Sequence, residues 1–367
     1  MRYAALLALA ILAGSCSSKR IVGDEGYDWP SNDRSYWPTR GWRVVESMKM
    51  AEAGAFARND PLTRCLLVVK DGVIAFEQYY GGGGRDASTE VWSVTKSFTS
   101  ALVGIAMEKT DLDGTEDLMV DHLPEYPAFG DIRLHHALTH TTGLRFSEEG
   151  ESWMRWVWSP DWTAEALSRP KDHRAGEHFL YGSANSQFLC DLIRKKTGQT
   201  PGDFARRNLF GPLGIRLDQL PPAMTYQTWD DYKVPVPHCW RQDTRGTEIG
   251  GFGLHLTARE MAKFGFLFLN RGRWEDRTVV PESWVKESTR DQVTGIRRYS
   301  YGYHWWIARV DGAPCFLASG LGGQIIGVVP SRDLVVVIKY ESENPQEHAD
   351  AKHDDMKLFA LASRAAR

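Results

Sequence analysis

Ser93 and Lys96 are residues that could form a nucleophile and its base. They stand three positions apart at the predicted start of an apolar helix that continues to Met107, and residues with this spacing share a helix face. A serine hydroxyl needs an adjacent base to act as a nucleophile. A lysine packed against apolar residues loses its proton more readily, because desolvation disfavours the charged form. The helix start also supplies backbone N–H groups near a developing oxyanion.

The Ser-x-x-Lys pattern by itself is weak evidence for catalysis. It occurs at two further places, Ser168/Lys171 and Ser283/Lys286. The first contains an internal proline, which disfavours a helix through it. The second follows Pro281 and is typical of an ordinary helix start. Support for Ser93 must therefore come from the rest of the chain.

The elements that position this helix predict an α+β fold. Residues 65–70 and 73–80 are strand-like, and Asp71-Gly72 between them is a strong hairpin signal. We therefore expect an antiparallel sheet flanked by helices, with a mostly helical inserted subdomain and the site in the cleft between them. Further helices are expected over 42–58, 257–269 and 350–364, and further strands over 301–307, 314–318, 324–329 and 334–340. Thr257 is expected to N-cap the helix over 257–269, with Glu260 completing a capping box.

The expected domain limits follow from this order of elements. Residues 41–110 and 245–367 are predicted to form the sheet domain, and residues 111–244 the helical insertion. Residues 17–40 are polar and aromatic and are expected to be a tether or an extended arm. A chain of 367 residues with 42% hydrophobic content can bury a core of this size.

Five ordered blocks resemble those of the serine β-lactamase and penicillin-binding-protein superfamily. They are Ser93–Lys96, Leu138–Leu144, Phe179–Ser186, Gly250–Arg259 and Gly320–Gln324. The resemblance spans roughly residues 60–345, and five blocks in order are far more specific than one Ser-x-x-Lys. Within the superfamily the chain is most similar to the class C-like esterases and to the 6-aminohexanoate-dimer hydrolases.

The resemblance implies roles for three residues. Ser93 would be the acylated nucleophile, Lys96 its proton partner, and Tyr181 the general acid/base of the Tyr-x-Asn motif. A phenol that is to lose its proton needs a nearby cation, and Lys96 supplies one. No cofactor and no metal are implied.

Two departures from the family pattern bear on the substrate. Where penicillin-recognising members have Lys-Thr-Gly, this chain has Leu321-Gly322-Gly323, and Ser183 replaces the expected asparagine. The cation that attracts a substrate carboxylate is therefore missing. The backbone N–H of Gln324 is expected to be the second oxyanion donor beside that of Ser93.

Further residues are candidates for substrate binding. Ser183 is expected to orient the substrate or to hydrogen-bond Lys96, and Gly322, Gly323, Trp92 and His255 are also expected to contact substrate. Trp158 belongs to a tryptophan-rich stretch that either lines an acyl or aromatic subsite or packs the insertion. The same stretch holds Trp153, Trp156 and Trp162, with the acidic residues Glu148, Glu149 and Glu151. His140 is expected to be a structural hydrogen-bonding residue.

The N-terminus predicts export. Residues 1–16 have a positive start, a short apolar run and small residues before Cys16, which resembles a bacterial lipoprotein signal. Cys16 would then be acylated and would anchor the protein to the outer membrane, facing the periplasm. A plain secretory signal is the alternative.

The net charge and the cysteine spacing bear on possible partners and metal sites. A net charge of −3 gives no reason to expect nucleic acid as a partner. The spacing of Cys65, Cys190, Cys239 and Cys315 does not suggest zinc, and sequence cannot choose among their possible pairings.

These observations predict a serine hydrolase that forms an acyl-enzyme at Ser93 and hydrolyses a small ester or amide. One alternative is a DD-peptidase or β-lactamase acting on peptidoglycan-like or β-lactam substrates. The other is a non-catalytic binding lipoprotein on the same fold.

Overall fold

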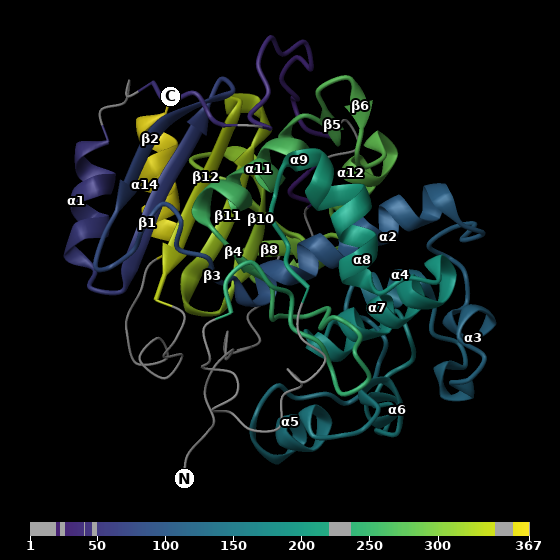
Figure 1. The fold of residues 1–367 in the computed structure, drawn as a ribbon. Coiled ribbons are helices and arrows are strands. Elements are labelled where there is room, and N and C mark those ends of the chain that lie inside the picture. The colour runs from purple at the N-terminus through teal and green to yellow at the C-terminus, as the bar shows by residue number, and fades with distance from the viewer. Residues whose placement is uncertain are drawn as a thin grey trace.

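An antiparallel sheet forms the centre of the molecule (Figure 1). The computed structural model describes residues 20–22, 26–39, 41–45, 50–219, 236–341 and 355–366. Asp71 and Gly72 join the first two strands with φ angles of 50° and 83°, as a tight hairpin turn requires. In sheet order, the strands of the described part are β2 (Val73–Tyr79), β1 (Thr63–Lys70), β12 (Leu334–Tyr340), β11 (Gln324–Val329), β10 (Ala313–Gly320), β9 (Trp306–Val310), β8 (Tyr299–Tyr301) and β7 (Val293–Ile296).

Helices cover both faces of the sheet (Figure 1). Strand β12 is buried along its whole length, which explains why its sequence is an almost unbroken apolar run. Helices α1 (Ala51–Asn59) and α14 (Asp355–Ala365) pack on one face. Helices α2 (Thr95–Lys109) and α11 (Ala258–Leu269) pack on the other. The predicted fold class, a sheet flanked by helices, is confirmed.

A mostly helical region follows α2 in the chain. Its described helices are α3 (Met119–His122), α4 (Leu134–Leu138), α5 (Gly150–Val157), α6 (Trp162–Leu167), α7 (Ser183–Thr197), α8 (Pro201–Ala205) and α9 (Gly211–Leu213). The remaining short elements are β3 (Thr89–Glu90), β4 (His255–Leu256), β5 (Arg273–Trp274), β6 (Arg277–Thr278) and α12 (Glu282–Ser288). The exact domain limits stay a prediction.

Two local predictions have different outcomes. The capping box at the start of α11 is confirmed, since Thr257 accepts from the Glu260 amide at 3.2 Å and Glu260 accepts from the Thr257 amide at 2.8 Å. The helix predicted over 42–58 begins only at Ala51. Val44 instead bridges Ile74 of β2, because the Val45 N–H donates to the Ile74 carbonyl at 2.8 Å and the Ile74 N–H donates to the Arg43 carbonyl at 3.0 Å.

The described part of the N-terminal segment is an extended arm that packs on the core. Tyr27 is buried and meets Phe316 edge-on, with ring centroids 5.5 Å apart. Arg34 pairs with both carboxylate oxygens of Asp333 at 2.6 and 2.5 Å. Of the two forms expected for this segment, the extended arm therefore describes residues 26–39. Cys16 lies outside the described residues, and none of the described helices combines the length and apolar character needed to cross a bilayer.

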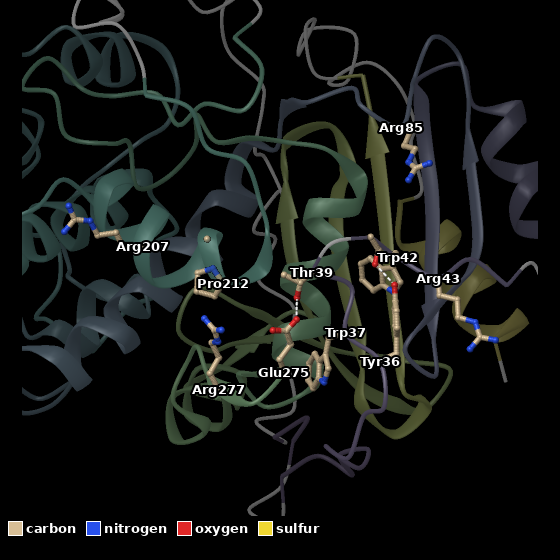
Figure 2. A pocket seen from close by; sticks show the side chains of 12 residues that line it. Tyr36, Trp37, Thr39, Trp42, Arg43, Arg85, Arg207, Pro212, Glu275 and Arg277 are labelled. Atoms are coloured by element: carbon tan, nitrogen blue, oxygen red, sulfur yellow. Dashed lines mark hydrogen bonds between the residues drawn. The ribbon is translucent and has the colours of Figure 1, made fainter.

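The arm also borders an open pocket of about 940 Å³. Trp37 and Trp42 contribute to its wall, together with residues of α9 and β6. Figure 2 shows Arg43, Arg85 and Arg207 spread around it rather than converging on one point. The lining includes neither Ser93 nor Lys96, so the site predicted from sequence lies elsewhere.

Candidate functional site

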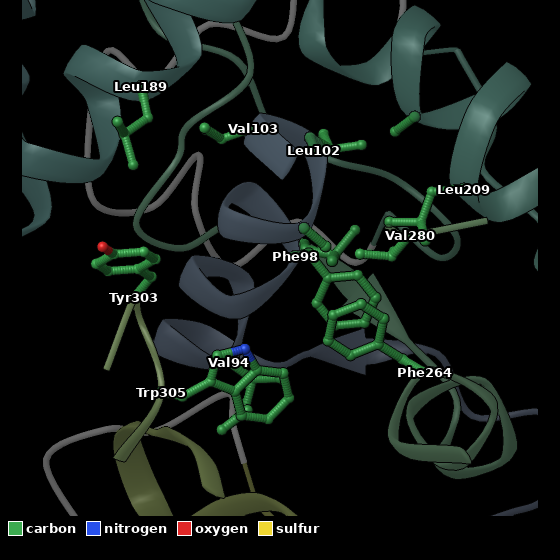
Figure 3. Packing of buried hydrophobic residues seen from close by; sticks show 14 of the residues in the cluster. Val94, Phe98, Leu102, Val103, Leu189, Leu209, Phe264, Val280, Tyr303 and Trp305 are labelled. Atoms are coloured by element: carbon green, nitrogen blue, oxygen red, sulfur yellow. The ribbon is translucent and has the colours of Figure 1, made fainter. Parts of the chain in front are cut away.

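Helix α2 holds the predicted nucleophile segment inside the hydrophobic core (Figure 3). Its residues from Thr95 to Ala106 are all buried. Phe98 stacks on Phe264 of α11 at 3.7 Å between ring centroids. At Gly104 a Cβ atom would lie 2.2 Å from the Trp284 ring, so only glycine allows this close approach. Packing on all sides fixes the start of the helix with respect to the sheet.

Ser93 lies in a 3₁₀ turn, η1 (Trp92–Val94), that leads directly into α2. Trp92 has a φ of 50°, a conformation that is rare for a bulky side chain and that often marks a functional turn. Trp92 itself is buried, with 7% exposure, and its place before the nucleophile suits a structural role at least as well as the predicted substrate contact. Ser93 keeps 8% exposure.

Lys96 is a buried amine with three hydrogen-bond acceptors around it. Its Nζ donates to Ser93 Oγ, to Ser183 Oγ and to the Gly251 carbonyl oxygen, each at 2.9 Å. Burial lowers the pKa of Lys96 to about 8, against the opposing effect of Glu148. A substantial fraction of Lys96 is therefore neutral near that pH and can accept a proton from Ser93. The predicted hydrogen bond between Ser183 and Lys96 is present.

Tyr181 completes the predicted trio. Lys96 Nζ lies 4.8 Å from the centre of its ring. Burial and the charge of Glu148 raise the pKa of Tyr181, while a hydrogen bond with Ser93 acts in the opposite direction. The Tyr181 phenol therefore keeps its proton in the free protein, and a resting phenolate at this position is disfavoured. The arrangement suits Tyr181 as a proton donor, with neutral Lys96 as the base.

Aromatic side chains and two histidines enclose this trio. Trp306 of β9 stacks on Tyr181, with ring centroids 5.6 Å apart. The ring centroids of His140 and Tyr181 lie 4.7 Å apart, and His140 hydrogen-bonds the Tyr301 hydroxyl at 3.2 Å, as expected for a hydrogen-bonding residue. Burial lowers the pKa of His140 and His304 well below the usual value, so both stay neutral. They shape the site without adding charge to it.

The approach of β10 to Ser93 bears on the oxyanion hole. A Cβ at Gly320 would lie 2.3 Å from the Val91 carbonyl oxygen and 3.2 Å from the Ser93 nitrogen. The backbone N–H of Gln324, predicted as the second donor, stays a prediction; the Gln324 side chain hydrogen-bonds the Tyr340 backbone of β12. Gly322 and Gly323 form the turn between β10 and β11. The backbone at Gly320, the last residue of β10, therefore lies beside Ser93.

Two other predicted substrate contacts lie outside the Lys96 network. His255 is 6% exposed and its Nδ1 faces Cys239 Sγ at 3.4 Å and the Gly253 carbonyl at 3.2 Å. Burial lowers the pKa of His255 to about 3. Trp158 is 58% exposed at the end of α5. These positions give neither residue a described contact with Ser93.

The tryptophan-rich stretch mainly packs the helical region. Trp156 and Trp162 are buried and lie 4.4 Å apart, and Trp153 packs on Phe252. Of the two alternatives left open for this stretch, packing therefore describes these three tryptophans.

All four described cysteines are buried free thiols.

Glu148 is the site residue that the sequence did not single out. Its Oε1 accepts from the Ser183 hydroxyl at 2.5 Å and from the Ser183 backbone N–H at 2.6 Å. The sequence showed Glu148 only as one of several acids in a loop, and no spacing pattern linked it to Ser183. The Gly251 carbonyl and Trp306 were missed for the same reason, since they approach from distant parts of the chain.

Comparisons with known proteins agree with the fold. The family model described as Beta-lactamase matches residues 49–360. A 6-aminohexanoate-dimer hydrolase of Paenarthrobacter ureafaciens is 21% identical over 75% of this chain and 71% of its own length. The structure of a putative 6-aminohexanoate-dimer hydrolase from Bacillus anthracis is similar with a TM-score of 0.66 and 19% identity, covering 83% of this chain and 79% of the other. A family VIII carboxylesterase gives a TM-score of 0.66 at 15% identity, over 89% and 99% of the two chains.

The fold and the ordered site residues define a protein of the serine hydrolase superfamily that includes β-lactamases and penicillin-binding proteins. The chain belongs to the Beta-lactamase family. The 6-aminohexanoate-dimer hydrolases and a carboxylesterase are among the proteins it resembles.

Proposed function

We propose that this protein is a serine hydrolase that forms an acyl-enzyme at Ser93 and hydrolyses a small ester or amide. The observation that carries the proposal is the 2.9 Å contact between Ser93 Oγ and the buried Lys96 amine, beside Tyr181. A hydroxyl, a base that is partly neutral and a protonated phenol are the groups that acyl transfer requires.

The proposed reaction has two halves. Neutral Lys96 takes the Ser93 proton as Oγ attacks the substrate carbonyl, and the backbone N–H of Ser93 and a donor from the end of β10 hold the oxyanion. Tyr181 protonates the leaving group as the C–O or C–N bond breaks. Lys96 then passes the proton it gained to Tyr181, which restores the neutral amine and the phenol. Water attacks the acyl-enzyme as neutral Lys96 takes its proton, and Lys96 returns that proton to Ser93 Oγ as the acyl–oxygen bond breaks.

The residues near the nucleophile favour an ester or amide without a recognised carboxylate. Residues Ala313–Gly323, which include the end of β10 beside Ser93, contain no lysine or arginine. The carboxylesterase and the 6-aminohexanoate-dimer hydrolases that the chain resembles support an ester or amide substrate. The competing proposal, a DD-peptidase or β-lactamase, lacks the cation expected to bind its substrate carboxylate.

Covalent labelling tests the proposed nucleophile. A fluorophosphonate probe is expected to label the wild-type protein and to leave Ser93→Ala unlabelled, because the Ser93 hydroxyl, 2.9 Å from the Lys96 amine, is the proposed nucleophile. Short p-nitrophenyl acyl esters should be hydrolysed with a higher kcat/KM than a chromogenic cephalosporin. Ser283→Ala, in the Ser-x-x-Lys sequence outside the site, is the matched control.

The outcomes separate the alternatives. Preferential turnover of the cephalosporin would favour the β-lactamase or DD-peptidase assignment. Folded wild-type protein that shows no Ser93-dependent labelling would contradict the hydrolase and would favour a binding lipoprotein on the same fold.

We also propose that the protein is exported and anchored through acylated Cys16, which rests on the sequence of residues 1–16 alone. In bacteria fed an alkyne fatty acid, the wild-type chain is expected to incorporate the label, and Cys16→Ser is expected to lose it. Equal labelling of both chains, or a mature N-terminus other than residue 16 by mass spectrometry, would contradict the anchor.

A further inference from the structure

Ser183 links the predicted base to a carboxylate on a different segment. Its hydroxyl donates to Glu148 Oε1 at 2.5 Å and accepts from Lys96 Nζ at 2.9 Å. Its backbone N–H donates to the same carboxylate oxygen at 2.6 Å. The four groups thus form a chain from Glu148 through Ser183 and Lys96 to Ser93.

A hydroxyl has only one proton to donate. Because the Ser183 proton points to Glu148, Ser183 can only accept from Lys96. The Gly251 carbonyl oxygen is also an acceptor only, and it lies 2.9 Å from Lys96 Nζ. A neutral amine has two N–H bonds and one lone pair, so these two acceptors occupy both N–H bonds. The lone pair is left for Ser93 Oγ, which is the direction needed to take its proton.

We propose that Glu148 is a positioning residue that directs the lone pair of neutral Lys96 toward Ser93 by fixing the Ser183 hydroxyl. The inference rests on the proposed function and specifies how its base is prepared. Without an acceptor at position 148, the Ser183 hydroxyl can rotate and donate to the Lys96 lone pair, which competes with proton transfer from Ser93.

The charge of Glu148 has a second effect. A nearby negative charge favours the protonated amine, and Glu148 raises the pKa of Lys96 against the effect of burial. The other titratable groups around Lys96 are Tyr181, whose pKa is raised, and His140 and His304, whose pKa values are lowered by burial. These three groups are uncharged in the working range, so Glu148 is the charged partner among the described neighbours of Lys96.

Two substitutions separate orientation from charge. Glu148→Gln keeps an oxygen acceptor and removes the charge, so the acid limb of the kcat/KM profile is expected to move to lower pH with a change in kcat of about threefold or less. Glu148→Met removes the acceptor at similar size, and the rate of acylation is expected to fall about 10- to 100-fold, which corresponds to losing one hydrogen bond to a charged group. Glu149→Gln, the neighbouring acid, is the matched control and should behave as wild type.

A double-mutant cycle tests whether Glu148 acts through Ser183. In a Ser183→Ala background, Glu148→Met is expected to cause no further loss, because no hydroxyl remains to be misoriented. An additive loss, or a Glu148→Gln variant as impaired as Glu148→Met, would overturn the orientation role. Unchanged acylation and an unchanged acid limb in Glu148→Met would overturn it as well.

A measurement of the Lys96 pKa tests the coupling to Glu148 without relying on catalytic turnover, and so without relying on the proposed function. NMR titration of the Lys96 side chain is expected to give a lower pKa in Glu148→Gln than in wild type, and the same pKa in Glu149→Gln. No difference between Glu148→Gln and wild type would contradict the charge coupling whether or not Ser93 is labelled. Because Glu148→Gln is nearly isosteric, this comparison tests the charge coupling even if Glu148→Met does not fold. The orientation role is then tested with Glu148→Ala, which also removes the acceptor and should slow acylation in the wild-type background but not in Ser183→Ala.

Discussion

Lys96→Met is expected to lower kcat/KM for a p-nitrophenyl ester by at least about 10³-fold, because it removes the only amine that contacts the Ser93 hydroxyl in the described structure. Fluorophosphonate labelling should slow by a similar factor. Methionine fills most of the lysine volume, and it removes a buried amine whose charged form is already disfavoured. The free energy of unfolding should therefore change by no more than about 2 kcal/mol.

The pH dependence identifies the same group. The base must be neutral to accept a proton, and the pKa of Lys96 is lowered to about 8. Wild-type kcat/KM should therefore rise with pH through about 8 and then level off, and the residual activity of Lys96→Met should lack this limb. Lys286→Met, on the exposed face of α12, is the control. A wild-type profile that is flat between pH 6 and 9 would contradict the role of Lys96.

Gly320→Ala is expected to reduce kcat/KM by about 10²- to 10³-fold, the usual cost of losing one oxyanion donor. The added methyl would lie 2.3 Å from the Val91 carbonyl oxygen and 3.2 Å from the Ser93 nitrogen, so β10 and η1 must move apart. Because the moving atoms are backbone, the displacement reaches the Ser93 N–H directly. KM should change less than kcat, since the lost interaction strengthens in the transition state.

The control for Gly320→Ala is Gly114→Ala, where the nearest atom to a new Cβ is 4.0 Å away and φ does not require glycine. Gly114→Ala should leave both rate and stability nearly unchanged. A crystal structure of Gly320→Ala with an undisplaced Ser93 and full activity would show that β10 does not supply the donor. Gln324, the donor predicted from the sequence, would then be the next residue to consider.

Much of the fold was predictable because its signals are local. The Asp71-Gly72 turn, the capping box at Thr257 and the apolar run of β12 each act over a few residues and appear in the structure where the sequence placed them. Two local predictions failed. The helix over 42–58 starts late, since the backbone before position 46 pairs with Ile74, and the strand predicted over 301–307 is divided into β8 and β9. Sheet pairing outweighed helix periodicity before position 46.

The sequence by itself determined that Ser93 and Lys96 share a helix start, because residues three apart on a helix must lie on one face. Only the tertiary structure decided what surrounds that pair. Glu148 reaches Ser183 across 35 residues and the Gly251 carbonyl reaches Lys96 across 155, through loops whose course no periodicity specifies. The burial that lowers the pKa of Lys96 arises from the same long-range packing. The proximity of Ser93 and Lys96 can thus be predicted from their spacing, whereas the protonation and orientation of Lys96 depend on segments that meet only when the chain folds.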